Sequence, residues 1–380
     1  MALKIYLDTQ DYIALYKNRS AEQQAVYEYL QKRIASKQIK IGFSYAIIAE
    51  FLQDYEEAYR EDRLQRAKLI KELCGKNCYR YIDKLNSGNA FSENGDWTPD
   101  FGEVLSLDKI KNDVIEEIIK SLPHLSSGQQ KALKNKRGLK RLIKSNREIF
   151  LTGKEFGNSE IPLSEKFIKE NMLIRFIIGE LPRRVVQEEF LSFITDTELF
   201  LIAWFEYGKK GRLLYDLMHT PQENLRTAMT FLASAISAAK RLNKNIKSVE
   251  RSIYKSDMPQ ISKTDLDNIK SKKIKVPIID KSWIKEAMNS KDTKDYFPDI
   301  FWEVVACYVN RSLSRLDHLK DSDIIDIFHA IYIPYCDLWR GDKDFCSTLS
   351  SGNVTGKDKI VSKLSDLPDR IEYLLNETKN

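Results

Sequence analysis

The hydrophobic and polar positions near the amino terminus predict two strand-to-helix steps. Residues 4–7 form an apolar run that ends at Asp8, and residues 39–44 alternate between apolar and polar side chains. Both patterns are typical of strands that lie in a sheet. Each is followed by apolar residues at helical spacing, and Thr9 has a side chain that commonly caps a helix. Glu50 is the only acid in the first turns of the otherwise apolar second helix.

The pattern around residue 330 predicts a third step of this kind. Residues 321–330 are amphipathic at helical spacing, Pro334 stops the helix, and residues 336–339 form a short apolar strand. A helix places Asp323 and Asp326 on one face, because positions i and i+3 are neighbours. Two carboxylates of this segment are therefore expected side by side.

Two further carboxylates follow the last strand. Asp342 and Asp344 lie just after it, and open α/β sheets build their sites at the carboxyl ends of their strands. Carboxylates that converge on one point repel each other strongly unless a cation neutralises them. An all-oxygen ligand set suits magnesium or manganese better than zinc. The segment therefore predicts a site for Mg²⁺ or Mn²⁺.

The central part of the chain predicts a helical insertion. Residues 87–99 are rich in turn formers, and apolar residues recur at helical spacing across most of residues 104–254. No repeat of fixed period is present. We therefore expect residues 1–80 to form the first half of an α/β core, residues 81–295 a mostly α-helical insertion, and residues 296–380 the second half of the core with a carboxyl-terminal tail.

Composition is compatible with a soluble cytoplasmic protein. The 61 basic and 55 acidic residues give a formal charge of +6, which permits nucleic-acid binding without requiring it. Five cysteines and no signal peptide favour reduced thiols. Cys74 and Cys78 have the spacing of half a zinc site, but no second pair follows at ligand spacing. No apolar run reaches the roughly 18 residues of a membrane span, so no membrane role is expected.

Four short acidic motifs carry a family resemblance. They are Leu7-Asp8-Thr9, the step from Ser44 to Glu50, Asp326-x-x-His329-Ala, and Gly-Asp342-Lys-Asp344-Phe345. Each motif is weak alone, since an aspartate after a strand is common. All four in sequence, each beside the expected strand or helix, resemble the acidic motifs of PIN-domain nucleases. The resemblance covers only the two ends of the chain.

This resemblance implies a Rossmann-like α/β/α core with a parallel sheet, and divalent-metal-dependent hydrolysis of phosphodiester bonds, usually in RNA. The implied cofactor is Mg²⁺ or Mn²⁺, and the implied partner is nucleic acid. The implied site consists of the catalytic, metal-binding quartet Asp8, Glu50, Asp326 and Asp342, the flanking metal ligands Asp344 and Asp323, and the supporting residues Thr9, Ser44 and His329. The sequence departs from the family at Gln10, where Asn or Ser is usual, and at Arg340-Gly341, where Thr or Ser commonly precedes the last acid.

Each of these residues also has an ordinary structural explanation. Asp8 and Asp326 could cap helices, and Asp342 and Asp344 could shape a turn. His329 could be a satisfied histidine on a half-buried helix. These explanations do not account for Glu50 on an apolar helix, or for four acids near one expected edge of the sheet. We therefore favour the metal site.

Cations recur every three or four residues between Lys131 and Arg147, which predicts one basic helix face. The candidate nucleic-acid ligands are Lys134, Lys136, Arg137, Lys140 and Arg141. Such contacts bind phosphates and supply affinity without sequence choice. The alternative is a solvated helix face. A second basic run over residues 209–212 follows aromatic residues that could stack a base or, alternatively, close a helix in the core.

Two other functions stay open from the sequence. One is a metal-dependent nuclease acting on single-stranded or flap DNA, because contacts to the 2′-OH leave no readable pattern here. The other is a catalytically degenerate nucleic-acid-binding or scaffold protein. The large insertion suggests restraint by a regulatory protein partner, or selection of the substrate.

Overall fold

The structure, a computed structural model, describes the two ends of the chain and one central segment. The described residues are 2–16, 19–51, 59–85, 89–98, 164–207, 297–315 and 321–377, with a few isolated positions between 127 and 285. Most of the basic segment predicted to bind nucleic acid lies outside them. Of its five candidate ligands only Arg141 is described, as an exposed residue, while Lys134, Lys136, Arg137 and Lys140 are not.

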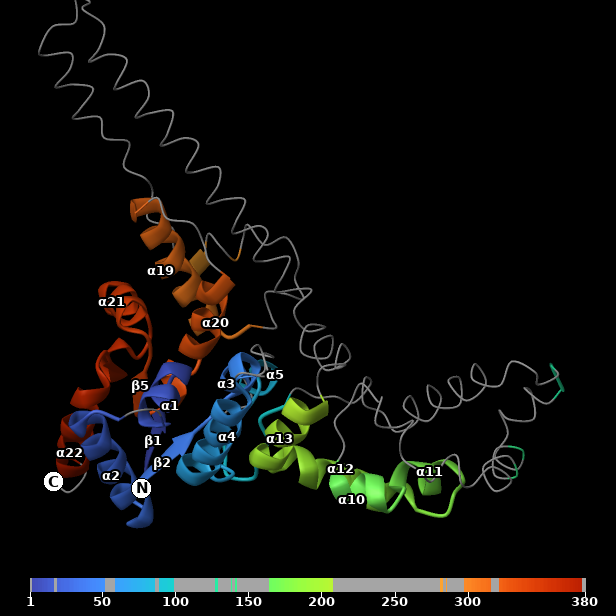
Figure 1. The fold of residues 1–380 in the computed structure, drawn as a ribbon. Coiled ribbons are helices and arrows are strands. Elements are labelled where there is room, and N and C mark those ends of the chain that lie inside the picture. Colours follow the sequence, from blue (N-terminus) through green and yellow to red (C-terminus); the bar gives the residue numbers. More distant parts are fainter. Residues whose placement is uncertain are drawn as a thin grey trace, which may run out of the picture.

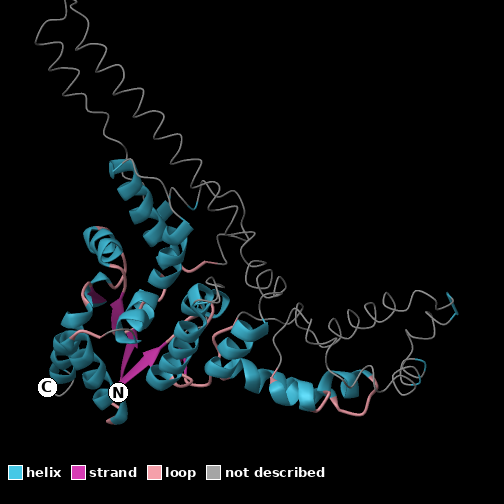
Figure 2. Ribbon diagram, viewed as in Figure 1, coloured by secondary structure: helices cyan, strands magenta, loops and turns pink. Residues whose placement is uncertain are grey.

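A four-stranded parallel sheet joins the two ends of the chain (Figures 1 and 2). Its strands are β1 (Leu3–Tyr6), β2 (Ile39–Gly42), β5 (Leu338–Arg340) and β6 (Ile360–Val361), in the order β2-β1-β5-β6. All three strand pairs are parallel. The α/β class and the parallel sheet are thus confirmed, and the strands predicted over residues 4–7, 39–44 and 336–339 lie within one or two residues of their expected places.

The order of the strands creates a switch point beside β1. The chain passes from β1 to β2 on one side, and a strand from the other end of the sequence, β5, pairs with the opposite side of β1. In open α/β sheets, ligand sites form at the carboxyl ends of the strands where the order reverses in this way. The segments that follow β1 and β5 therefore occupy the expected place for a site.

Helices connect and cover these strands (Figure 1). The first half contains α1 (Thr9–Tyr16), α2 (Ala21–Ala35), α3 (Tyr45–Phe51) and α4 (Arg60–Cys74). The second half contains α19 (Asp299–Arg315), α20 (Asp321–Ala330), α21 (Lys343–Ser351) and α22 (Leu367–Glu377). Near the two termini α2 packs against α22, so both ends of the chain belong to the same folded unit.

The first helix does not begin as the sequence suggested. The amide of Tyr12 donates to the backbone carbonyl of Asp8, so Asp8 occupies the capping position and Thr9 is the first helical residue. The expectation that Thr9 caps this helix is therefore wrong. The Asp8 carboxylate supports the start of the helix, because its Oδ1 accepts the amide of Thr9 at 2.7 Å.

Aromatic side chains from both ends of the chain form the centre of the core. Tyr6 in β1 stacks on Tyr332 with ring centroids 5.3 Å apart, and its ring is also parallel to that of Trp339 in β5. All three are fully buried. Burial of a large apolar side chain contributes about 1.5–3 kcal/mol, so these contacts hold the sheet together across more than three hundred residues of sequence.

A small antiparallel pair extends the first half. It consists of β3 (Cys78–Tyr79) and β4 (Phe91–Ser92), and Cys78 bridges in parallel to Phe43 after β2. Gly42 is required at this point, because a Cβ there would lie 2.7 Å from ring atoms of Phe91 and Tyr79. The pair is thus packed directly on the end of β2.

Part of the predicted insertion covers this first half. The central helices are α10 (Glu165–Lys169), α11 (Met172–Ile177), α12 (Arg183–Thr195) and α13 (Thr197–Tyr207). Helix α13 packs along α4 (Figure 1), and the indole of Trp97 donates to the carbonyl of Ile194. The segment is helical where it is described. Its division from the core at residues 80 and 295 stays a prediction, since most of residues 99–296 lies outside the described part.

None of the helices in the described ranges combines the length and the apolar character needed to cross a bilayer.

Candidate metal centre

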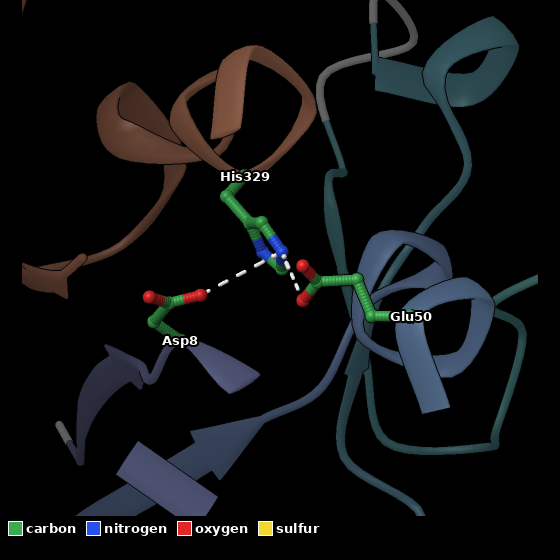
Figure 3. Close-up of side chains that lie close together, drawn as sticks. All are labelled: Asp8, Glu50 and His329. Carbon is green, nitrogen blue, oxygen red and sulfur yellow. Dashed lines mark hydrogen bonds and ion pairs between the residues drawn. The ribbon is translucent and has the colours of Figure 1, made fainter. Parts of the chain in front are cut away.

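Three separate elements bring Asp8, Glu50 and His329 together (Figure 3). Asp8 follows β1, Glu50 lies on α3, and His329 lies near the end of α20. Nε2 of His329 is 3.0 Å from Oε2 of Glu50 and 3.6 Å from Oδ1 of Asp8. One ligand atom from each residue lies within 4.8 Å of the other two. We call these three residues the acid–histidine cluster.

The fold explains why these side chains meet. Asp8 lies two residues past the carboxyl end of the central strand β1, and α3 starts just after the neighbouring strand β2. Helix α20 packs against α3, which places His329 above the same edge of the sheet. The cluster therefore lies at the carboxyl edge, beside the switch point between β1 and β5.

Burial sets the electrostatics of the two carboxylates. Asp8 is buried, which raises its pKa, and the nearby Glu50 raises it further, while the charge of His329 opposes both effects. Glu50 is half-buried. Burial raises its pKa too, but the charge and hydrogen bond of His329 outweigh this and the pKa falls below its usual value. The ionised form of both carboxyl groups is thus stabilised by a positive charge placed between them.

His329 supplies that positive charge. Its ring is fully buried, and burial lowers its pKa, but Glu50, Asp8 and Asp326 together raise the pKa to about 9. The ring is therefore an imidazolium at neutral pH, and both nitrogens donate. Nε2–H donates to Glu50, so the histidine is satisfied, as the structural alternative expects, and its partner is an acid of the site.

The other ring nitrogen is bound by Tyr6. Nδ1 of His329 lies 2.5 Å from the Tyr6 hydroxyl, which is 2.8 Å from Oγ of Ser44. Burial raises the pKa of Tyr6 well above 10, so the phenol stays neutral and can accept from Nδ1–H while donating to Ser44. The indole of Trp339 also donates to the His329 carbonyl at 2.9 Å. Sequence reasoning identified Ser44 but missed Tyr6, whose position in β1 indicates only a core residue.

A second buried pair holds the segment that carries Asp8. The Asp8 amide donates to Oδ2 of Asp11 at 3.1 Å, and Oδ1 of Asp11 is 3.2 Å from a guanidinium nitrogen of Arg340. Burial raises the pKa of Asp11 to about 7, although Arg340 lowers it. Sequence reasoning gave Asp11 no role. It noted Arg340 only as a departure from the family pattern, and the departure in fact supplies a counter-charge to Asp11.

Asp326 joins the cluster through its charge. It lies on α20 one turn before His329 and is half-buried. Burial raises its pKa to about 7, His329 lowers it, and the negative charges of Asp8, Glu50 and Asp342 raise it. Asp326 is therefore within electrostatic range of the other three acids of the expected quartet.

Asp342 has a structural task at this edge. Its Oδ1 accepts the amides of Asp344 at 2.9 Å and Phe345 at 3.2 Å, which makes it the N-cap of α21. The side chain is exposed and is not one of the three clustered ligands. Asp342 thus borders the site through its effect on Asp326 and combines this with the turn-shaping role considered from the sequence.

The remaining expected ligands lie apart from the cluster or outside the description. Asp344 is exposed, and its carboxylate lies 3.7 Å from a guanidinium nitrogen of Arg311 on α19. The side chain of Asp323 is not among those that the structure describes. Cys74 and Cys78 are buried, which raises the pKa of each thiol to about 12 and keeps it protonated. They have the character of core thiols, as expected.

The donors of the cluster fit a divalent cation. Two carboxylates and an imidazole are common metal ligands, and the repulsion between the acids is the kind that a cation relieves. The buried Thr9 hydroxyl is close enough to Glu50 to lower the pKa of that acid, yet it has no hydrogen-bond partner of good geometry in the described part of the chain. This leaves a polar group at the site for a ligand or its water.

Comparison of the chain with protein-family models, with curated proteins and with solved structures finds no match. Any function must therefore be argued from the residues of this site.

Proposed function

We propose that this protein is a divalent-metal-dependent nuclease, an endoribonuclease of the PIN type that uses Mg²⁺ or Mn²⁺. The observation that carries the proposal is the meeting of Asp8, Glu50 and His329 beside Asp326 at the carboxyl edge of a parallel sheet. The two acids come from motifs near the start of the chain, and the other two residues come from a motif near its end. This meeting of residues from three of the four acidic motifs supports the expectation that the motifs form one site.

Asp8 and Glu50 would hold the metal, and Asp326 and Asp342 would add negative charge nearby. When bound, such an ion lowers the pKa of its water and neutralises charge on the leaving oxygen. Asp8 is well suited to this task, because the Thr9 amide and the Asp11 side chain fix its orientation. A ligand that is fixed before the metal arrives costs less entropy on binding.

Asp326 is the best candidate for proton transfer. Its pKa is raised to about 7, so near neutral pH this carboxyl group can both accept a proton and release it. It is half-buried, whereas Asp8 is fully enclosed. We therefore assign Asp326 to the attacking water and Asp8 to the metal.

A catalytically degenerate nucleic-acid-binding protein is the second candidate. The observation that favours it is the position of Asp342, which caps α21 and lies outside the three-residue cluster. A site that has lost one acid of the quartet would hold a metal more weakly and could retain only binding.

One experiment separates these functions. The purified full chain is incubated with total RNA, tRNA and single-stranded DNA in Mg²⁺, Mn²⁺ or EDTA. We expect cleavage of RNA that requires metal and that is lost in Asp8→Asn. The matched control is Asp344→Asn, an exposed acid paired with Arg311, which should cleave as the parent does. Cleavage that persists in EDTA would contradict the metal mechanism, and binding without cleavage would favour the degenerate protein.

A further inference from the structure

The acid–histidine cluster contains a nitrogen donor as well as oxygen donors. Nε2 of His329 lies near both carboxylates, at 3.0 Å from Oε2 of Glu50 and 3.6 Å from Oδ1 of Asp8. Figure 3 shows the ring between the two acids, with Nε2 facing both. A cation held by Asp8 and Glu50 in this place would therefore meet the imidazole.

The opposite side of the ring has the arrangement that metal-binding histidines need. Such a histidine almost always donates its second N–H to a fixed acceptor, which sets the tautomer and the ring orientation. Here Nδ1 is hydrogen-bonded to the neutral, fully buried Tyr6 hydroxyl, which is itself hydrogen-bonded to Oγ of Ser44. With Nδ1–H donating to Tyr6, the lone pair of a neutral ring is on Nε2, directed toward the acids.

We infer that His329 is a direct metal ligand through Nε2, so that the site is a mixed nitrogen–oxygen centre that selects Mn²⁺ or another first-row transition ion over Mg²⁺. This rests on the proposed metal-dependent function and makes it more specific. Imidazole is a good ligand for transition ions, whereas Mg²⁺ prefers oxygen ligands and gives up its waters reluctantly. The sequence, which indicated an all-oxygen site, did not distinguish the two ions.

The competing explanation is that His329 acts only as a counter-ion. Its imidazolium would then neutralise Asp8 and Glu50 in the metal-free protein and leave the metal to the carboxylates. The two explanations differ in one observable property. A ligand shares electron density with the metal through Nε2, and a displaced counter-ion does not.

Pulsed electron paramagnetic resonance of bound Mn²⁺ detects this directly, because a coordinated imidazole gives a ¹⁴N coupling. The full chain has four histidines, and it must be prepared without a histidine tag. A variant with His124, His219 and His318 all replaced by Gln retains His329 as its only histidine. We expect the ¹⁴N coupling in the parent and in this variant, and its loss in His329→Gln. Bound Mn²⁺ without ¹⁴N coupling in the parent, or with coupling that disappears in the triple variant, would overturn the inference.

Metal selectivity gives a second measurement. The ratio of the dissociation constants for Mg²⁺ and Mn²⁺, obtained by titration calorimetry, should fall at least about tenfold in His329→Gln, because an amide oxygen replaces the nitrogen. Tyr6→Phe removes the partner of Nδ1 and should weaken Mn²⁺ binding by about tenfold or more while affecting Mg²⁺ less. An unchanged ratio in both variants would contradict a nitrogen ligand.

These readouts do not depend on catalysis. Coupling to His329 in a protein that cleaves no nucleic acid would support the mixed centre and contradict the proposed nuclease. Metal-dependent cleavage with no ¹⁴N coupling would support the proposed nuclease and contradict the mixed centre. If His329→Gln fails to fold, the parent and the triple variant still decide the question.

Discussion

Arg340 in β5 lies 3.2 Å from Asp11 in α1, so a buried ion pair links the strand near the end of the chain to the segment that carries Asp8. The two residues are 329 positions apart, yet Asp11 is almost inaccessible and the guanidinium is largely covered. Asp11 in turn accepts the Asp8 amide. The ion pair therefore helps to hold the backbone of Asp8, a candidate metal ligand, in place.

Breaking this pair should be costly. Arg340→Met leaves the Asp11 carboxylate buried without its counter-charge, and loss of one partner of a buried pair costs about 3–5 kcal/mol. We expect a fall in unfolding free energy toward the lower end of this range, measured by urea denaturation of the metal-free protein. Adding Asp11→Asn, which removes the stranded charge, should restore part of the loss. The matched control is Arg184→Met, since its pair with Glu188 is exposed to solvent and should contribute little to stability. Similar losses for Arg340 and Arg184 would show that the pair has no special role.

The carboxylates of Asp8 and Asp326 should not be needed for folding. Asp8→Asn and Asp326→Asn each remove a negative charge from a group of mutually repelling carboxylates. We expect the metal-free variants to be as stable as the parent or slightly more stable, with cleavage lost in both. Bound metal should raise the melting temperature of the parent and hardly change that of the double variant. A variant that is less stable but cleaves normally once folded would identify that acid as structural.

The pH dependence of stability should reveal the imidazolium. The pKa of His329 is raised from 6.5 to about 9, so the folded state binds this proton more tightly than the unfolded state does. The resulting stabilisation is complete below about pH 6.5 and is lost as the pH rises through 9, an effect of the order of 2 kcal/mol. Urea denaturation of the metal-free parent at pH 7 and pH 9.5 should show this loss, and the loss should be smaller in His329→Gln, where only the buried carboxyl groups still titrate. An equal change in unfolding free energy with pH in the parent and in His329→Gln would contradict the raised pKa of His329.

Metal should reverse this trend, because a cation replaces the proton as the partner of Glu50 and Asp8. The extra stability that Mn²⁺ confers should grow between pH 6 and pH 9, since its ligands must be deprotonated.

The two tasks of Asp342 can be separated by paired substitutions. Asn is as good an N-cap as Asp but carries no charge, whereas Ala loses the cap at a cost of about 1 kcal/mol. We expect Asp342→Asn to retain the stability of the parent and Asp342→Ala to lose about this amount in thermal unfolding. If Asp342 also contributes charge to the metal site, both variants should cleave poorly. Normal cleavage by Asp342→Asn would limit the residue to capping α21 and would favour a site built from the other three acids.

Local patterns and long-range contacts differ in how far the sequence could predict them. Asp8, Glu50 and Asp326 were predictable, because each follows a strand or lies on a helix whose periodicity is visible in the sequence. The links from Tyr6 to His329 and from Asp11 to Arg340 were not. Each joins residues more than three hundred positions apart and exists only once β1 and β5 pair. No local pattern distinguishes a tyrosine that binds a histidine from one that only fills the core.

The role of the basic segment between Lys131 and Arg147 stays a prediction from sequence, since most of it lies outside the described residues. If the face between Lys131 and Arg147 holds nucleic acid, its charges act through phosphates and counterion release. Replacing Lys134, Lys136, Arg137 and Lys140 together by Gln should then weaken binding to all sequences alike. The slope of log affinity against log salt should flatten by something under about one unit per lost contact.

Turnover at saturating substrate should change little in this fourfold variant, because these residues lie outside the acidic motifs and would contribute binding that ground and transition states share. Fluorescence anisotropy over a series of salt concentrations measures the affinity, and single-turnover cleavage measures the rate. Unaltered affinity and salt slope would mean that the segment is a solvated helix face. The substrate would then have to be held elsewhere, and the aromatic and basic run over residues 204–212 would be the next place to test.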